Sequence, residues 1–131
     1  MSSYTLEVGS AQYNLKLTAR WAEKCEELLG KPVVEALDDI LRTRTLAVLL
    51  WGALQCNHPC SIDNAYDIID GLVEEGKGSI EERGLLAQYI LETAGFFTPE
   101  ETALFVKSVV EQQKAAQKRV QEALKEASPE A

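Results

Sequence analysis

The sequence predicts a mainly α-helical bundle of about five or six helices with one β-hairpin at its N-terminus. Apolar and polar residues alternate before Thr18, which is the pattern of strands. After Thr18, apolar residues recur every three or four positions, which is the pattern of amphipathic helices. Residues that favour helix starts and stops then divide the chain into segments of helical length.

The hairpin is predicted from two alternating segments, residues 4–8 and 13–17, with Gly9 and Ser10 between them. Its inward-facing residues are expected to be Tyr4, Leu6, Val8, Tyr13, Leu15 and Leu17. A lone hairpin is marginally stable in water, so we expect it to pack on helices. Its two outer edges are open to pairing unless another element covers them.

Two helices are expected next. Thr18 can cap the first, which carries an apolar stripe and meets a natural stop at Gly30; the stripe is Trp21, Cys25, Leu28 and Leu29. Pro32 can open the second in its first turn. Its apolar stripe is Val33, Val34, Leu37, Ile40 and Leu41, with Asp38 and Asp39 pointing elsewhere.

The most apolar segment of the chain, residues 46–54, is predicted to be the central helix of the domain. Leucine, alanine and tryptophan favour helix, and apolar residues fill most of its circumference. The segment Asn57-His58-Pro59 should end it. Trp21 and Trp51 lie on apolar faces and are expected in the core.

Two further helices begin at serines. Ser61 is predicted to cap one whose buried face is Ala65, Ile68, Ile69 and Leu72. Residues 74–78 should form a turn. Ser79, with Glu82 three residues later, predicts a capping box at the start of the second helix. That helix carries Leu85, Leu86, Tyr89 and Ile90.

The last helix is predicted to start at Thr98-Pro99-Glu100-Glu101 and to run into the 120s. Phe96 is interpreted as a hydrophobic staple, or the pair Phe96-Phe97 as core. The first part of this helix has Ala103, Leu104 and Val106, and beyond them apolar residues become sparse. We therefore divide the chain into a hairpin plus helical body, residues 1–106, and a charged, Gln-rich tail, residues 107–131, that is helical or disordered and dispensable for the body's stability.

The charge is unevenly distributed along the chain. Residues 1–106 hold 8 basic and 17 acidic side chains, a net charge of −9, and residues 107–131 hold 5 and 4, a net charge of +1. An acidic body disfavours nucleic acid and anionic membranes and can complement a basic protein partner. No signal-peptide pattern and no membrane-length apolar run is present, so we expect a cytoplasmic protein. Three cysteines, an odd number, favour reduced thiols.

Two groups of residues could carry chemistry. Cys56, His58 and Cys60 have zinc-like spacing, but a structural site needs a fourth ligand, and Cys25 could supply it only if the fold brought it near. A Cys–His catalytic pair is disfavoured because no orienting group follows. Three aspartates, Asp63, Asp67 and Asp70, share one helix face; like Asp38 and Asp39, they are interpreted as solvated. We therefore predict no catalytic residue, no metal site and no cofactor.

The layout resembles the tail assembly chaperones of long-tailed phages and prophages of Gram-positive bacteria. The resemblance covers residues 4–106: the hairpin, the element Leu28-Leu29-Gly30-Lys31-Pro32, the apolar segment Leu49-Leu50-Trp51-Gly52-Ala53-Leu54, the helix over residues 62–72, and a helix ending near Gly95-Phe96-Phe97. It implies a non-enzymatic protein that holds the long tape measure protein during tail assembly and is absent from the finished tail. It also implies a frameshifted longer product whose added domain recruits tail tube subunits, with the residues from Lys107 as the tether.

Two alternatives stay open. One is a generic acidic helical adaptor or regulatory protein that forms a homo-oligomer, which binding to a tape measure fragment would distinguish. The other is a small zinc-binding module built on Cys56, His58 and Cys60, which metal analysis would distinguish.

Overall fold

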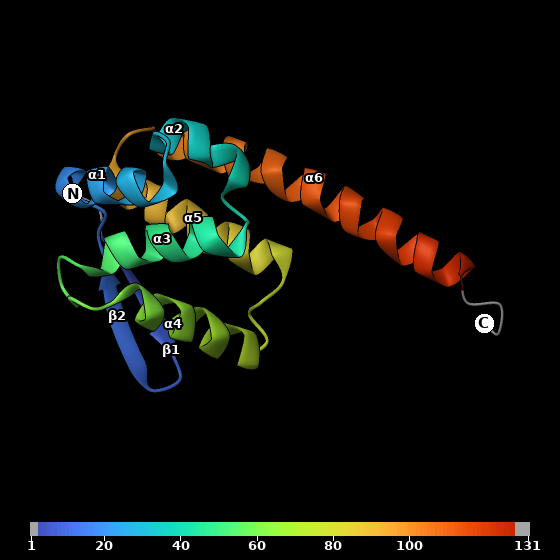
Figure 1. Ribbon diagram of the computed structural model, residues 1–131, viewed down its shortest axis with the longest axis horizontal. Coiled ribbons are helices and arrows are strands. Elements are labelled where there is room, and N and C mark those ends of the chain that lie inside the picture. Colours follow the sequence, from blue (N-terminus) through green and yellow to red (C-terminus); the bar gives the residue numbers. More distant parts are fainter. Residues whose placement is uncertain (1–2, 128–131) are drawn as a thin grey trace.

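A computed structural model describes residues 3–127 and confirms the predicted fold class: a mainly helical bundle with an N-terminal antiparallel hairpin. Figure 1 shows the hairpin and helices α1 to α5 packed together, with α6 leaving this body as a long arm. The elements in chain order are β1 Tyr4–Val8, β2 Ala11–Leu15, α1 Ala19–Leu29, α2 Val33–Ala36, the 3-10 turn η1 Leu37–Asp39, α3 Thr43–Leu54, α4 Ile62–Glu74, α5 Ile80–Ala94 and α6 Pro99–Glu126.

The hairpin has the predicted inward face. Tyr4 pairs with Leu15 and Val8 with Ala11, which leaves a two-residue turn with Gly9 at a φ of 60°. Leu6, Leu15 and Leu17 are buried, and Tyr4, Val8 and Tyr13 are half-buried. The second strand ends at Leu15, two residues earlier than predicted, because the next backbone amides bond to helices. The Lys16 amide donates to the Ala53 carbonyl at 2.9 Å, and the Leu17 amide donates to Thr93 Oγ1 at 3.0 Å.

Helix α3 is the centre of the body, as predicted. Nine of its 12 residues are buried, and it contacts α1, α4, α5 and β2. Its crossing with α1 is close at Gly52, where a Cβ atom would collide with the Sγ of Cys25. A residue without a side chain is therefore what allows these two helices to approach.

Most of the predicted helix ends are confirmed. The hydroxyls of Thr18, Ser61, Ser79 and Thr98 each accept a backbone N–H from the first turn of their helix. Full capping boxes form at Thr98, with Glu101, and at Ser61, where Asn64 is the partner. Residues 75–78 form the predicted turn, one residue shorter than expected because Glu74 still belongs to α4. The box predicted for Ser79 is only half formed, because the Glu82 side chain turns toward a pocket beside β1 instead.

The second predicted helix is broken and partly misassigned. It divides into α2 and η1, and Pro32 precedes the helix rather than lying in its first turn. The carboxylate of Glu26 accepts the amide of Val33 at 2.8 Å and so caps α2 from another helix. Val34 is 63% exposed, which corrects its assignment to the buried stripe. The tighter 3-10 turn is what brings Leu37 onto the core side.

Three further apolar predictions need correction. Leu28 is exposed. Trp21 and Trp51 are half-buried, and they contact each other edge to face with ring centroids 5.5 Å apart at the rim of the core. Phe97, not Phe96, is the residue before the Thr98 cap and is half-buried, whereas Phe96 is 45% exposed.

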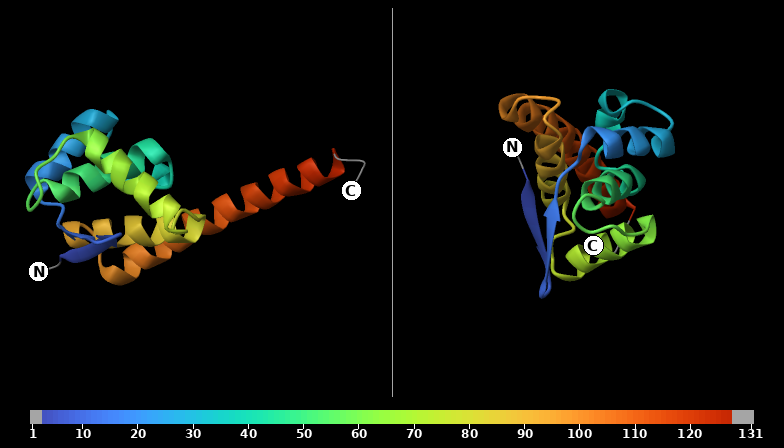
Figure 2. Two further views of the ribbon diagram at one scale, coloured as in Figure 1. Left: turned by 90° about the horizontal axis from the view of Figure 1, so that it is seen from below. Right: turned by 90° about the vertical axis from the view of Figure 1, so that its left-hand side faces the viewer.

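Helix α6 is 28 residues long and packs along α5 through its first half. Its buried residues are Thr102, Val106 and Val109. The remaining helix projects away from the body (Figures 1 and 2). Leu104, predicted as part of the apolar signal, is exposed. The helix crosses residue 106 without a break, and whether the chain divides there stays a prediction.

Candidate functional site

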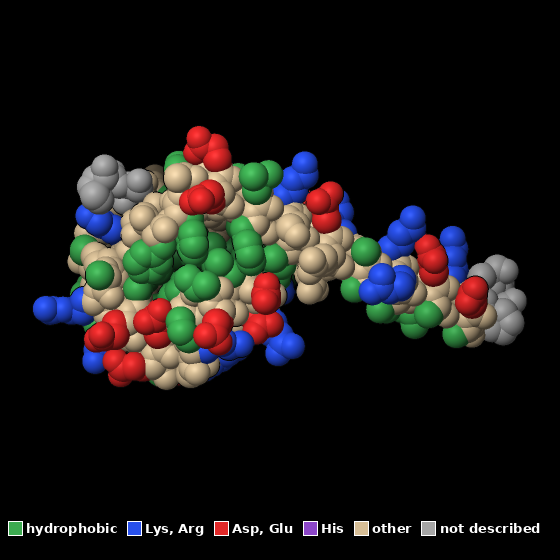
Figure 3. Space-filling model, turned by 90° about the horizontal axis from the view of Figure 1, so that it is seen from above, with side chains coloured by type: hydrophobic (Ala, Val, Ile, Leu, Met, Phe, Trp, Pro, Cys, Tyr) green, Lys and Arg blue, Asp and Glu red, His purple; other side chains and the backbone are tan. Residues whose placement is uncertain are grey.

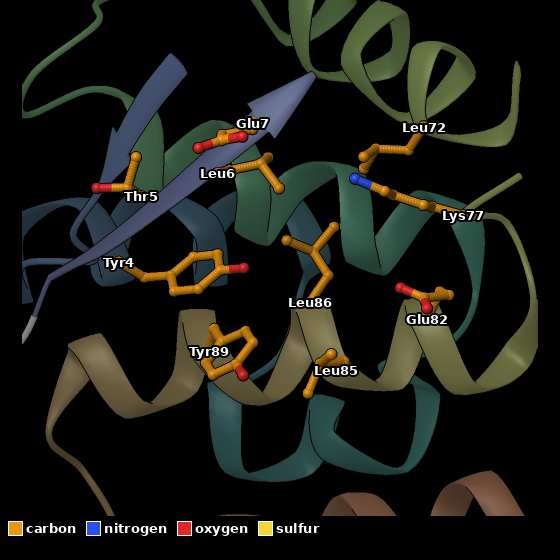
Figure 4. Close-up of a pocket in the computed structure, with 10 residues that line it drawn as sticks. All are labelled: Tyr4, Thr5, Leu6, Glu7, Leu72, Lys77, Glu82, Leu85, Leu86 and Tyr89. Carbon is orange, nitrogen blue, oxygen red and sulfur yellow. The ribbon is translucent and has the colours of Figure 1, made fainter. Parts of the chain in front are cut away.

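A pocket of about 300 Å³ lies between strand β1 and helix α5 (Figure 4). Leu6 and Leu86 point into it from the two elements, and Leu72 reaches it from α4. The rings of Tyr4 and Tyr89 stack with centroids 4.1 Å apart and an interplanar angle of 10°. The pocket therefore has an apolar interior with an aromatic pair at one side; its lining residues are Tyr4, Thr5, Leu6, Glu7, Leu72, Lys77, Glu82, Leu85, Leu86 and Tyr89.

Polar groups surround this interior. Burial raises the pKa of the Tyr4 hydroxyl, and the neighbouring Tyr89, Glu7 and Glu82 raise it further. Lys77 is the cation of the lining, and its Nζ lies 3.7 Å from a carboxylate oxygen of Glu75. The lining holds phenols, carboxylates and one amine, without the hydroxyl–imidazole or thiol–imidazole pair of a nucleophilic enzyme. This arrangement can bind an apolar side chain together with a polar group.

A second pocket of about 360 Å³ lies between the hairpin, α4 and the segment that follows α3; it is lined by Val8, Tyr13, Leu54, His58, Pro59, Cys60, Asn64, Asp67 and Ile68. His58 has a structural role at its wall. Its Nε2 accepts the Asn14 amide at 2.8 Å, and its ring meets Tyr13 edge to face at 5.4 Å. The Asn57 side chain donates to the Asn14 carbonyl at 3.1 Å. The loop therefore fastens β2 to the end of α3.

His58 and Cys60 line the same pocket, but the structure does not gather Cys25, Cys56, His58 and Cys60 into one group. Cys56 is exposed, and the Cys60 Sγ accepts a hydrogen bond from Gln55 at 3.5 Å. Cys25 lies in the core, where its thiol donates to the Val48 carbonyl and burial raises its pKa to about 12. Within residues 3–127, no three His, Cys, Asp or Glu side chains form a group able to hold a metal ion.

The aspartates lie largely as predicted. Asp63, Asp67 and Asp70 are exposed on α4 opposite its buried face, and Asp38 is also exposed. Asp39 is the exception, because it is half-buried and ion-paired rather than simply solvated. Its carboxylate lies 2.8 Å from the Lys31 Nζ and 3.4 Å from the Arg42 Nε. The hydrogen bond from Lys31 lowers the pKa of Asp39.

One broad surface stands out on the side of the body shown in Figure 3. Apolar side chains gather between the α1–α2 pair and the α5–α6 pair, and acidic side chains border them on both sides. We call this surface the apolar face. Half-buried apolar residues of its bordering elements are Leu29, Phe97 and Phe105. Residues 19–39 along one border hold six acidic and three basic side chains, and residues 80–106 along the other hold five and one.

Sequence reasoning missed the apolar face and both pockets as sites. Each is assembled from elements far apart in the chain, and no local pattern shows which helices will become neighbours.

No family model, curated protein or solved structure matches this chain. None of the helices in residues 3–127 is both long and apolar enough to cross a membrane.

Proposed function

We propose that this protein is a non-enzymatic tail assembly chaperone of a long-tailed phage or prophage, acting in the host cytoplasm. Its client would be the tape measure protein, held during tail assembly. A frameshifted extension of the chain, if the gene produces one, would recruit tail tube subunits. The proposal starts from the resemblance in layout, and one structural observation supports it best: the apolar face with acidic borders.

The apolar face suits an amphipathic helix. Such a helix buries apolar residues spaced three and four apart in a groove or on a flat apolar surface. The apolar side chains of this face are exposed to water in Figure 3, so a bound helix would remove apolar surface from water. The acidic residues on both borders favour a client helix flanked by lysine and arginine, and this attraction weakens with salt. A long, helical, aggregation-prone protein offers many such segments.

A second candidate is an acidic helical adaptor that works as a homo-oligomer. The observation that favours it is the projecting part of α6, which contributes nothing buried beyond Val109. Solvated helical arms of this kind commonly serve as contacts between chains. Neither candidate function uses nucleic acid, a membrane or a cofactor.

Co-expression with a tape measure fragment tests the client proposal. We expect the fragment to stay soluble and to co-purify with this protein at low salt, and to be released near 1 M salt, where the screening length is about 3 Å. A Phe105→Glu variant should lose the fragment, whereas Ala115→Glu, which adds the same charge to the solvated side of α6, should retain it. A fragment that precipitates equally with and without the protein would reject the proposal. A fragment retained equally by both variants would reject the apolar face as its site.

A further inference from the structure

The projecting part of α6 has an unpartnered apolar stripe. We call residues 114–126 the α6 arm; all of its residues except the half-buried Ala116 are exposed. Ala116, Val120, Ala123 and Leu124 are spaced by four, three and one residues, so they share one side of the helix. The same spacing continues backward to Val109 and Val106, which pack on the body. The arm thus extends the buried side of α6 into solvent.

The arm exposes large apolar side chains to water, which is unfavourable. Leu124 is 65% exposed and Val120 57% exposed. A helical segment of about 13 residues is marginal in water without tertiary contacts. In Figure 3, apolar side chains run along one edge of the arm, and basic and acidic side chains lie on its other side. A surface that covers this edge would stabilise the arm.

The charges of the arm identify the kind of surface that fits it. Lys114, at the start of the arm, pairs with Glu81 of its own α5 at 2.8 Å. The rest of the arm holds Lys118, Arg119 and Lys125 against Glu122 and Glu126, a net charge of +1. The body, residues 1–106, has a net charge of −9. Basic residues beside an apolar stripe are complementary to an apolar surface bordered by acids. The apolar face is such a surface.

The arm cannot reach the apolar face of its own copy. Helix α6 is continuous from Pro99 to Glu126, and its arm points away from the body in Figure 1 and in the left view of Figure 2. A straight helix of this length has no hinge at which to fold back. The occupant of the face must therefore come from another molecule.

We propose that the α6 arm of one copy binds the apolar face of a second copy, with Val120 and Leu124 as the apolar contacts. The arm and the face are different surfaces, so the contact is head-to-tail, and each added copy leaves one free arm and one free face. The result is an open chain of copies whose length increases with concentration. The same face serves the client in the proposed function, so a client helix would compete with the arm.

Pairing of two arms with each other is the alternative arrangement. Its seam would contain the same stripe, Ala116, Val120, Ala123 and Leu124, so the apolar area of the arm does not distinguish the two arrangements. Arm-to-arm pairing would also bring basic residues of like charge together, whereas arm-to-face pairing brings opposite charges together. The head-to-tail contact is therefore the one that the charges favour.

Sedimentation velocity of the full chain at increasing concentration tests the proposal. We expect a distribution that moves steadily to larger species without stopping at a dimer, and that shrinks in high salt. A V120Q/L124Q variant keeps net charge and helix propensity but removes the apolar contacts, and its self-association constant should fall at least tenfold. The matched control is Ala115→Gln, on the opposite side of the arm, which should leave self-association unchanged. A protein that stays monomeric at all concentrations would overturn the proposal.

Mixing the V120Q/L124Q variant with intact protein distinguishes arm-to-face binding from arm-to-arm pairing. The V120Q/L124Q chain has a defective arm but an intact apolar face, so fluorescently labelled V120Q/L124Q should still bind unlabelled intact protein and cap its open chains. Arm-to-arm pairing would leave the labelled variant free, and that result would reject the head-to-tail contact. A Glu23→Lys/Glu27→Lys variant changes two exposed acids of α1 and should accept the arm less well. Because these measurements contain no client, their failure would leave the tape measure proposal standing.

Discussion

Helix α3 and helix α6 are stabilised in opposite ways. Nine of the 12 residues of α3 are buried, and neighbours cover it on several sides. Three of the 28 residues of α6 are buried, and its main neighbour is α5. Both helices contact a partner at a glycine, Gly52 of α3 against α1 and Gly84 of α5 against α6. The first helix depends on tertiary packing everywhere, and the second only along the length that covers α5.

This difference indicates which helix can gain or lose contacts without disturbing the core. A helix enclosed by others cannot shift without creating cavities or clashes, so α3 fixes the arrangement of the body. A helix held along one face can lose or gain contacts with little effect on the rest, so α6 is the element available for contacts with other molecules. Five experiments test this contrast, in order of decreasing expected effect.

The largest loss of stability is expected from Gly52→Ala. The added methyl would collide with Cys25 Sγ and lie 3.0 Å from Leu17 Cδ1, so α1 must move away from α3. We expect a loss of about 3 kcal/mol in the free energy of unfolding, read from chemical denaturation. Adding Cys25→Ala should recover part of this loss, because it removes the colliding sulfur. Unchanged stability in Gly52→Ala would mean that the α1–α3 contact is looser than described.

Two truncations of α6 should differ in their effect on the melting temperature. A chain ending at Val106 loses Val109, which is 5% exposed, and Val110, which packs on the core. Burial of one valine contributes about 1.5–3 kcal/mol, so we expect the melting temperature to fall measurably. A chain ending at Ala115 keeps these contacts, and its melting temperature should match that of the full chain. Equal melting temperatures for all three chains would instead support the predicted boundary at residue 106.

Gly84→Ala should cost less than Gly52→Ala. Its Cβ would lie 2.5 Å from Val110 Cγ2, at the end of a side chain on a helix with one main neighbour. We expect a loss of about 1 kcal/mol in unfolding free energy, since α6 can shift outward. Val110→Ala in the same chain should restore room for the methyl. Hydrogen exchange should show the loosening in α6 and leave α3 protected.

Alkaline pH should reveal the buried thiol of α1. The pKa of Cys25, about 12, lies above its ordinary value, so the folded chain keeps a proton that the unfolded chain loses. Its contribution to stability is complete below about pH 8.5 and decreases as pH rises toward 12. The difference in unfolding free energy between the wild type and Cys25→Ala should therefore be smaller at pH 10 than at pH 8, as read from chemical denaturation. A stability difference that is constant with pH would contradict this burial.

The smallest effect is expected from Cys56→Ser with Cys60→Ser. Cys56 is exposed and Cys60 accepts one weak hydrogen bond, so the pair should cost less than about 0.5 kcal/mol. Thiol labelling at pH 8 should modify Cys56 at once and Cys25 only on unfolding. Stoichiometric zinc in protein purified without added metal, or a large loss of stability, would restore the zinc-module alternative.

Much of the fold could be read from local patterns. The switch from alternation to helical spacing at Thr18 predicted the hairpin and the bundle, and Thr98 and Ser61 marked helix starts through their own hydroxyls. The α2–η1 break was missed because the cap on Val33 comes from Glu26 of another helix. Trp51 was assigned to the core because apolar residues fill most of the circumference of α3, but its position at the rim of the body depends on α1 and on the loop that ends at Cys60.

The class of most segments and the two charges of the chain, −9 for residues 1–106 and +1 for residues 107–131, follow from the sequence alone. These depend on periodicity, capping residues and composition, which are local or additive properties. Where apolar side chains remain uncovered depends on how the helices pack. The apolar face requires α1 and α2 to lie opposite α5 and α6, and the α6 arm requires α6 to be longer than the partner it covers. Which helices become neighbours follows from packing of the whole core, and no single segment encodes it.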